Sequence, residues 1–182
     1  AIASRANTNA SFTAVSVSGN TVYPTGQEAT GFSLGLNGPV QIRAIDRPGL
    51  YNSQALPGQT SDLVQDAPNA RVNLLERDVA TIHRRSIALN RDLEAALSAQ
   101  TPFTTVFPTT GLAQQMQAVA RMIAARSTLG VSRQIYFVST GGYDTHSSQA
   151  PTLTGLHTTL AGAMRAFYDA TVELGVQNDV TA

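Results

Sequence analysis

The sequence contains no cysteine, and this absence excludes disulfide bonds, zinc–thiolate sites, iron–sulfur clusters and thiol nucleophiles. It also lacks any apolar run that approaches the ~20 residues of a membrane-spanning helix. Its 12 basic and 12 acidic residues balance, so no excess charge is present to attract nucleic acid or an anionic membrane surface. The composition therefore excludes thiol chemistry and predicts a chain with no nucleic-acid partner and no membrane span.

The length of 182 residues allows one hydrophobic core, which predicts one domain or a part of a larger one. The chain begins with Ala-Ile-Ala-Ser-Arg, without a methionine. It stops at residues 178–182, where a new strand is expected to begin after Gly175 has ended a helix. We interpret residues 1–182 as a single segment of a larger domain, either an internal piece of a longer protein or a processed product of one.

Residues 11–45 have the pattern of β-structure. Apolar residues between Phe12 and Val17 precede a Ser-Gly-Asn turn signal, and a second turn signal, Asn-Gly-Pro, follows at residues 37–39. This pattern predicts two small β-hairpins packed on one another. The stretch 46–60, which is rich in proline and glycine, is predicted to be an irregular connection.

Residues 61–182 read as helix, helix, strand and helix, followed by the start of a further strand near residue 178. This alternation predicts an α/β fold with a parallel sheet, in which residues 134–138 form a buried strand. The residues expected to face inward lie on one stripe of each helix. They are Leu75, Val79, Ile82, Leu89, Leu93 and Leu97 on the first, Leu112, Met116, Val119 and Ile123 on the second, and Leu153, Leu156, Leu160, Met164, Phe167, Thr171 and Leu174 on the third.

The residues with the clearest chemical potential follow the predicted strand directly, in the run STGGYDTHS at residues 139–147. Ligands and catalytic groups of open α/β sheets gather at the carboxyl ends of the strands. Asp144 and His146 would supply an oxygen and a nitrogen ligand for zinc, manganese or a similar divalent metal, or would pair as acid and base. The two glycines permit positive φ, and the N-terminus of the following helix would face the same place.

An alternative interpretation of this run needs no metal. Asp144 or Ser147 would then cap the following helix, and His146 would be an ordinary surface residue. His157, one turn into that helix, is either a further ligand or, as is more common, a partly buried structural histidine. The pair Asp144 and His146 is therefore a candidate site that the local pattern alone leaves open.

The remaining polar candidates have simpler interpretations. The cluster at residues 83–85, His-Arg-Arg, reads as the solvated face of a long helix, and Arg133 as an ion-pair or capping residue. Ser139 and Ser147 belong to no Gly-x-Ser-x-Gly elbow, and no glycine-rich phosphate loop is present. These residues give little support to a serine-hydrolase triad, and they leave the catalytic residues unknown.

Several of these stretches together resemble a known family. The segment 133–146 (RQIYFVSTGGYDTH), with 147–149 (SSQ) and 166–176 (AFYDATVELGV), resembles a large bacterial family of unknown function. Its members are typically exported by the twin-arginine route and are similar to the alkaline phosphatase and sulfatase superfamily. Residues 14–20 (AVSVSGN) and 25–27 (TGQ) are similar to the family's middle region, so the resemblance covers nearly the whole chain.

The resemblance implies a partial alkaline-phosphatase-like α/β/α sandwich with metal ligands at the carboxyl ends of its strands. Asp144 and His146 match the family's Asp-Thr-His and would be two ligands of a two-metal centre, in which paired ions hold the attacking and leaving oxygens of phosphoryl or sulfuryl transfer. The family's earlier Gly-Gly-Asn-Asp strand end, with the nucleophile and first ligand, is missing here, as are its later Ser-Asp-Phe-Gly-Arg and Asp-His-Gly blocks.

The resemblance thus implies the central fragment of an exported metal-dependent phosphoester or sulfoester hydrolase, located in the periplasm or on the cell surface. The fragment would be inactive alone, and its partners would be the missing segments of the same parent chain. The alternative is a non-catalytic cell-surface or assembly protein that uses the same fold, because one fold can serve either purpose. In that case the Gly-, Ser- and Thr-rich strands of residues 11–45 would pair with another chain, and the protein would self-associate.

Overall fold

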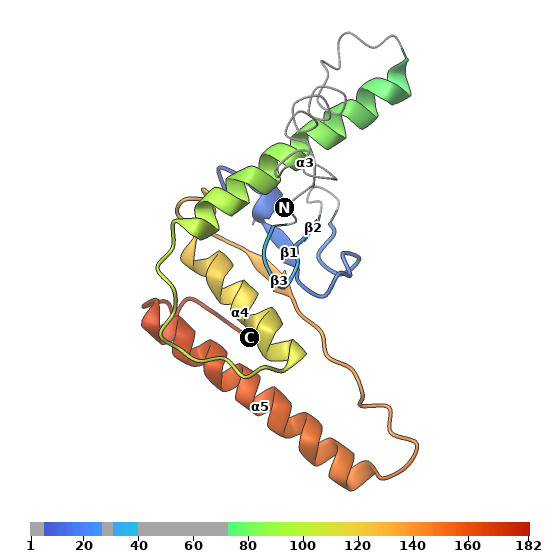
Figure 1. The fold of residues 1–182 in the computed structure, drawn as a ribbon, viewed down its shortest axis with the longest axis vertical. Coiled ribbons are helices and arrows are strands. Elements are labelled where there is room, and N and C mark those ends of the chain that lie inside the picture. The colour runs from blue at the N-terminus through green and yellow to red at the C-terminus, as the bar shows by residue number, and fades with distance from the viewer. Residues whose placement is uncertain (1–5, 27–30, 40–72) are drawn as a thin grey trace, which may run out of the picture. The chain divides into compact units, whose positions relative to one another are not determined.

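The structure, a computed structural model, describes residues 6–26, 31–39 and 73–182 (Figure 1). The chain divides into two compact units, one made of Ala1–Gly38 and Ala96–Ala182 and the other of Pro39–Ala95. The elements in order are η1 (Ala10–Phe12), β1 (Ala14–Ser16), β2 (Phe32–Ser33), α3 (Leu74–Ser98), α4 (Gly111–Ala124), β3 (Ile135–Phe137) and α5 (Gln149–Glu173).

The three described strands form one parallel sheet in the order β2-β1-β3. Val15 in the middle of β1 is opposite Phe32 of β2 on one side and opposite Tyr136 of β3 on the other. All three residues of β1 are buried, as expected for a strand with a neighbour at each edge. The predicted α/β class is confirmed by this sheet and the helices that accompany it.

The two predicted hairpins are wrong for the described part of residues 11–45. β1 and β2 run parallel, and the other partner of β1 is β3, far along the chain. A single antiparallel bridge, Gly35 to Gly38, lies in this part and closes a tight turn. The reason lies in residues 12–17, whose unbroken burial is typical of a strand covered on both faces, so long-range pairing overrides the local turn signals. Residues 27–30 and 40–45 lie outside the described ranges.

The strand predicted at 134–138 forms over Ile135–Phe137, but it is not buried as expected. β3 is the last strand of the described sheet, and the side chain of Ile135 is 60% exposed. The further strand expected near residue 178 is not formed either, because the residues from Val176 to Ala182 adopt turns and irregular structure. One edge of β3 therefore has no neighbouring strand among the described residues.

The second predicted helix agrees closely with α4, whose expected inward residues are all buried: Leu112, Met116, Val119 and Ile123. The hydroxyl of Thr110 caps it by accepting a hydrogen bond from the N–H of Ala113. α4 packs beside α5, as Figure 1 shows. The buried residues of α5 all lie in its C-terminal half. They are Ala163, Ala166, Phe167, Ala170 and Thr171.

The predicted stripe on the first helix is correct only near its C-terminal end. Leu93 and Leu97 of α3 are buried, whereas its earlier large apolar residues are exposed: Leu75, Val79 and Ile82. The buried face of the earlier turns passes instead through Ala80 and Ile87. The prediction used the spacing of large apolar side chains, and it therefore missed a buried face on which one of the residues is an alanine. Residues 61–72, which were also predicted to be helical, lie outside the described ranges.

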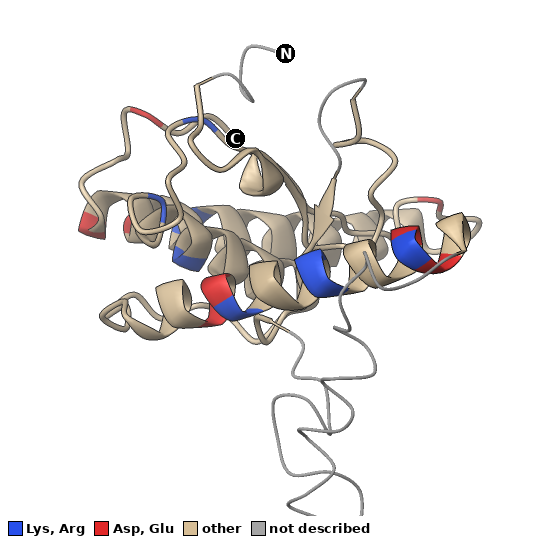
Figure 2. Cartoon of the chain, turned by 90° about the horizontal axis from the view of Figure 1, so that it is seen from above, with Lys and Arg blue, Asp and Glu red and all other residues tan. Residues whose placement is uncertain are grey.

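Charged residues of both signs are interspersed along the helices (Figure 2). Every basic residue in the chain is an arginine, because lysine is absent from the sequence. Within residues 6–26, 31–39 and 73–182, no helix combines the length and the apolarity needed to cross a membrane.

Candidate functional site

The candidate site lies on the loop that leaves the carboxyl end of β3 and leads to α5, at residues 138–148 (Figure 1). The start of this loop is fixed to α4 by the side chain of Gln115. Its Nε2 donates to the carbonyl oxygen of Ser139 at 2.8 Å, and its Oε1 accepts from the N–H of Ser139 at 2.9 Å. The amide thus pairs with the backbone as a neighbouring strand would. Sequence reasoning missed Gln115, because a glutamine on a helix usually faces solvent.

The middle of the loop packs on the first turns of α5. Gly142 has a φ of +93°, and a Cβ atom placed there would lie 3.4 Å from Cδ2 of Leu156. The next residue, Tyr143, places its ring 6.1 Å from the imidazole of His157, measured between centroids. The positive φ expected for this glycine pair is therefore found at Gly142, where a residue with a side chain would be strained.

Asp144 and His146 come together at the far end of the loop. Nε2 of His146 lies 3.4 Å from Oδ2 of Asp144, and the two side chains are 88% and 91% exposed, respectively. Two ligands that each lie about 2.1 Å from a zinc ion at the tetrahedral angle are separated by about 3.4 Å, so the spacing fits a shared metal. It fits equally an exposed ion pair, which contributes at most about 1 kcal/mol to stability.

The pair is only part of a metal site. No group of three or more His, Cys, Asp or Glu residues that could hold a metal occurs in the part of the chain that the structure describes. His157 is exposed and has its ring near Tyr143, so it is not brought to the pair as a further ligand. Since a zinc site takes about four ligands, Asp144 and His146 provide at most half of one.

The capping alternative is also incorrect in its details. The residue at the N-cap of α5 is Ser148, which has a left-handed conformation with φ of 50° and makes no capping hydrogen bond with its side chain. Asp144 instead has His146 as its partner. A non-glycine residue in this conformation is uncommon, and it marks the junction between the loop and α5 as a sharp turn.

The other polar candidates have structural roles or face solvent. The side-chain amide of Asn7 makes two hydrogen bonds with the backbone of Arg133. Its Oδ1 accepts from the N–H of Arg133 at 3.0 Å, and its Nδ2 donates to the carbonyl oxygen of Arg133 at 2.7 Å. Asn7 thereby fixes the entry to β3, a role that no local sequence pattern indicates. The cluster at residues 83–85 is exposed on α3, as predicted, and Ser139 and Ser147 are exposed on the loop.

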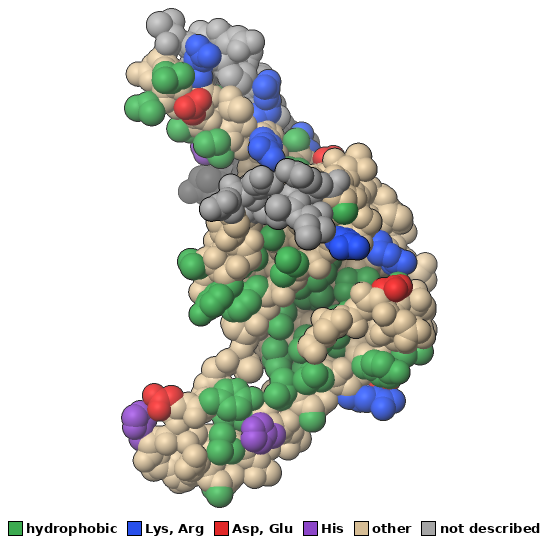
Figure 3. Space-filling model, turned by 180° about the vertical axis from the view of Figure 1, so that it is seen from behind, with side chains coloured by type: hydrophobic (Ala, Val, Ile, Leu, Met, Phe, Trp, Pro, Cys, Tyr) green, Lys and Arg blue, Asp and Glu red, His purple; other side chains and the backbone are tan. Residues whose placement is uncertain are grey.

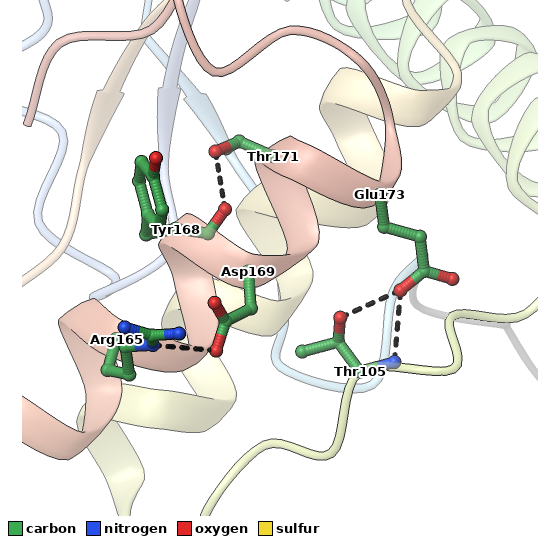
Figure 4. Close-up of polar contacts among 6 residues, drawn as sticks. All are labelled: Thr105, Arg165, Tyr168, Asp169, Thr171 and Glu173. Carbon is green, nitrogen blue, oxygen red and sulfur yellow. Dashed lines mark hydrogen bonds and ion pairs between the residues drawn. The ribbon is translucent and has the colours of Figure 1, made fainter.

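Glu173, in the family-like stretch 166–176, ties the end of α5 to the segment before α4. Its carboxylate accepts hydrogen bonds from the N–H of Thr104 at 2.8 Å, and from the N–H and the hydroxyl of Thr105 at 3.0 and 2.7 Å. Figure 4 shows the contact with Thr105 and, on the same helix, the ion pair of Arg165 and Asp169. The hydrogen bond from the backbone of Thr104, followed by that from the Thr105 hydroxyl, lowers the pKa of Glu173 to about 2.

This contact makes stability depend on pH. The pKa of Glu173 is lower in the folded chain than its ordinary value of 4.5, so the stabilisation is complete above pH 4.5 and is lost as the pH falls towards 2. We expect Glu173→Gln to lower the melting temperature at pH 6, with a difference from wild type that shrinks between pH 4.5 and pH 2. Thermal unfolding followed by circular dichroism measures this.

The control for this experiment is Glu76→Gln, which makes the same chemical change at an exposed position in the first turn of α3. A pH dependence of the Glu173→Gln difference equal to that of the control would show that the hydrogen bonds to Thr104 and Thr105 do not stabilise the carboxylate.

Comparison with known proteins adds no family to this geometry. No family model matches the chain, and no curated protein or solved structure is significantly similar to it. The resemblance of residues 133–146 and 166–176 to the bacterial family therefore depends on those sequence motifs.

Proposed function

We propose that this chain is the central part of an exported metal-dependent hydrolase of phosphoesters or sulfoesters, with an alkaline-phosphatase-like α/β/α sandwich. The observation that carries the proposal is the pairing of Asp144 and His146 at 3.4 Å on the loop that follows a parallel strand. The loop leaves the carboxyl end of β3, the side of an α/β sheet at which ligands bind, and the two donor atoms have the spacing of neighbouring ligands of a divalent metal.

In the proposed site, Oδ2 of Asp144 and Nε2 of His146 hold a divalent metal such as zinc or manganese. The metal would supply charge stabilisation to the oxygens of the transferred phosphoryl or sulfuryl group. Both side chains are almost fully exposed, so further donors can approach them from another polypeptide segment. Those donors and the nucleophile come from outside this chain, and the chain alone is expected to be inactive.

For the non-catalytic alternative, the described part of residues 11–45 offers little free strand edge. β1, the main strand of residues 11–45, already pairs with β2 and β3 and has no open edge. β2 ends the described sheet on that side but has only two residues, Phe32 and Ser33. The N-terminal strands are therefore a poor template for another chain, and we favour the metal-dependent function.

The first test uses Mn²⁺, whose unpaired electrons broaden the NMR signals of nearby nuclei. We expect low millimolar Mn²⁺ to broaden the imidazole signals of His146 and the backbone amides of residues 142–147 in this chain. Asp144→Ala should reduce the effect on His146 severalfold, because one of the two ligands is lost. The exposed residue His83 on α3 is the internal control, and His83→Ala should leave the broadening at His146 unchanged.

Equal broadening at His83 and His146 would contradict the proposal, as would unchanged broadening in Asp144→Ala. A second measurement addresses the missing ligands. The protein from its native source should have an intact mass above the 19.2 kDa of this chain. It should also hydrolyse p-nitrophenyl phosphate or sulfate in a manner that EDTA abolishes. A native mass of 19.2 kDa without metal would overturn the proposal.

A further inference from the structure

A large apolar groove runs beside β3, away from the loop with Asp144 and His146. Its volume is about 1390 Å³, and its walls come from α4, β3, α5 and the residues that follow α5. Pockets for small ligands usually measure about 300–1,000 Å³, so this groove has room for a larger occupant. Figure 3 shows hydrophobic side chains, in green, gathered on the face of the molecule that is seen from behind the view of Figure 1. The apolar lining includes Met116, Val119, Val138, Met164 and Phe167.

The edge of β3 that faces away from β1 offers free backbone groups. Ile135 donates its N–H to the carbonyl of Thr13 at 2.8 Å, and the carbonyl of Phe137 accepts from the N–H of Val17 at 2.9 Å. Because backbone groups alternate in direction along a strand, the N–H and carbonyl of Tyr136 point to the other side. No strand lies there in the described part of the chain. This edge can therefore accept hydrogen bonds from one more extended segment.

The side chain of Tyr136 supplies an independent sign of a missing partner. Its hydroxyl oxygen is buried and has no hydrogen-bond partner among the residues that the structure describes, and Tyr136 is one of the residues that line the groove. A buried hydroxyl without a partner costs about 1–3 kcal/mol. An occupant that displaces the atoms now covering this hydroxyl and brings a hydrogen-bond acceptor to it removes this cost, so the groove is suited to a polar as well as an apolar contact.

The charges at the amino end of β3 indicate the chemistry of the occupant. Arg126 and Arg133 both line the groove, and Asp179 is the one acidic residue among its described lining. Arg126 donates to the carbonyl of Ile123 at 3.0 Å. Neither arginine forms an ion pair within the ranges that the structure describes. The two guanidinium groups, without an ion-pair partner in those ranges, favour an acidic side chain of the occupant beside them.

From these observations we infer that the open edge of β3 and the adjoining groove bind an extended, acidic polypeptide segment of a partner as a fourth strand. The backbone of the segment pairs with Tyr136. Alternate apolar side chains enter the groove, and an acidic side chain lies near Arg126 and Arg133. This binding needs no metal, so its failure would leave the proposed hydrolase site untouched.

The test uses two fluorescein-labelled hexapeptides, Glu-Val-Thr-Val-Thr-Val and the same peptide with lysine in place of glutamate. At low salt, we expect the glutamate peptide to bind the chain about two- to fivefold more tightly by fluorescence anisotropy, as exposed charge pairs provide. The charge-reversed variant Arg133→Glu should invert the preference. Bound peptide should also protect the backbone amide of Tyr136 from hydrogen exchange.

Equal affinity for the two peptides, or a preference unchanged in Arg133→Glu, would overturn the inference that the partner is acidic. Absence of binding at millimolar peptide would overturn the inference that a segment adds to β3 as a fourth strand. Sedimentation velocity without peptide tests whether a second copy of this chain occupies the groove. Concentration-dependent dimers that protect Tyr136 would replace the proposed partner with this chain itself. The control variant Arg165→Glu changes a charge on α5 outside the groove and should not alter the preference.

Discussion

Replacing Phe12 with alanine is expected to lower the free energy of unfolding by about 3–5 kcal/mol. Phe12 is completely buried at the entry to β1, and its ring meets that of Phe32 edge to face, with centroids 5.1 Å apart. The substitution removes the largest of the fully buried side chains and leaves a cavity next to the central strand. Urea denaturation followed by circular dichroism measures the loss.

Val106→Ala is the matched control, because Val106 is 87% exposed and its truncation should change stability by less than about 0.5 kcal/mol. A loss for Phe12→Ala no larger than the control's would mean that the packing around β1 is not the stabilising core of its unit. A change in the slope of the denaturation curve, with no shift of its midpoint, would also contradict the expected cavity effect.

Ala163→Asp is expected to cost roughly 3–5 kcal/mol, because it places an unpaired charge where no solvent reaches. Ala163 is completely buried on the face of α5 that packs beside α4. The loss should become smaller as the pH is lowered, since a buried carboxyl that takes up a proton no longer carries charge. Denaturation at pH 7 and pH 4 separates this effect from crowding, which does not depend on pH.

Ala161→Asp provides the control on the same helix. Ala161 is exposed, so the same new charge should change stability by less than about 0.5 kcal/mol. Equal losses for the two variants would show that helix propensity, and not burial between α4 and α5, causes the effect. The comparison therefore tests the helix pair without relying on the identity of any ligand.

The sequence predicted what is local and missed what is distant. The spacing of Leu112, Met116, Val119 and Ile123 predicts the buried face of α4 because the helical period repeats within a few residues. The pairing of β1 with β3 cannot be read in this way, since Ala14 is opposite Ile135 across most of the chain. Turn signals near β1 predicted hairpins, although its real neighbours come from distant segments.

The candidate site shows the same division. Asp144 and His146 are two residues apart, so a loop is sufficient to bring them together, and the motif predicted their pairing. Gln115 and Asn7 carry no such signal, because each becomes important only when the fold brings it to the backbone of a distant residue, Ser139 or Arg133. The exposure of Ile135 was missed because an apolar run does not reveal whether its strand lies at an edge.

The separation between β1 and β3 also affects the order in which the chain folds. During synthesis β1 leaves the ribosome long before Ile135, its partner, has been made. Closing so long a loop is slow, whereas α4 and α5 are near in sequence and can associate early. Until residues 135–137 have been made, β1 can therefore pair only with the two residues of β2, and its edge facing β3 stays open. An unpaired strand edge with apolar side chains is prone to aggregation, so the interval before β3 is made is the stage at which this chain is most exposed to misassembly.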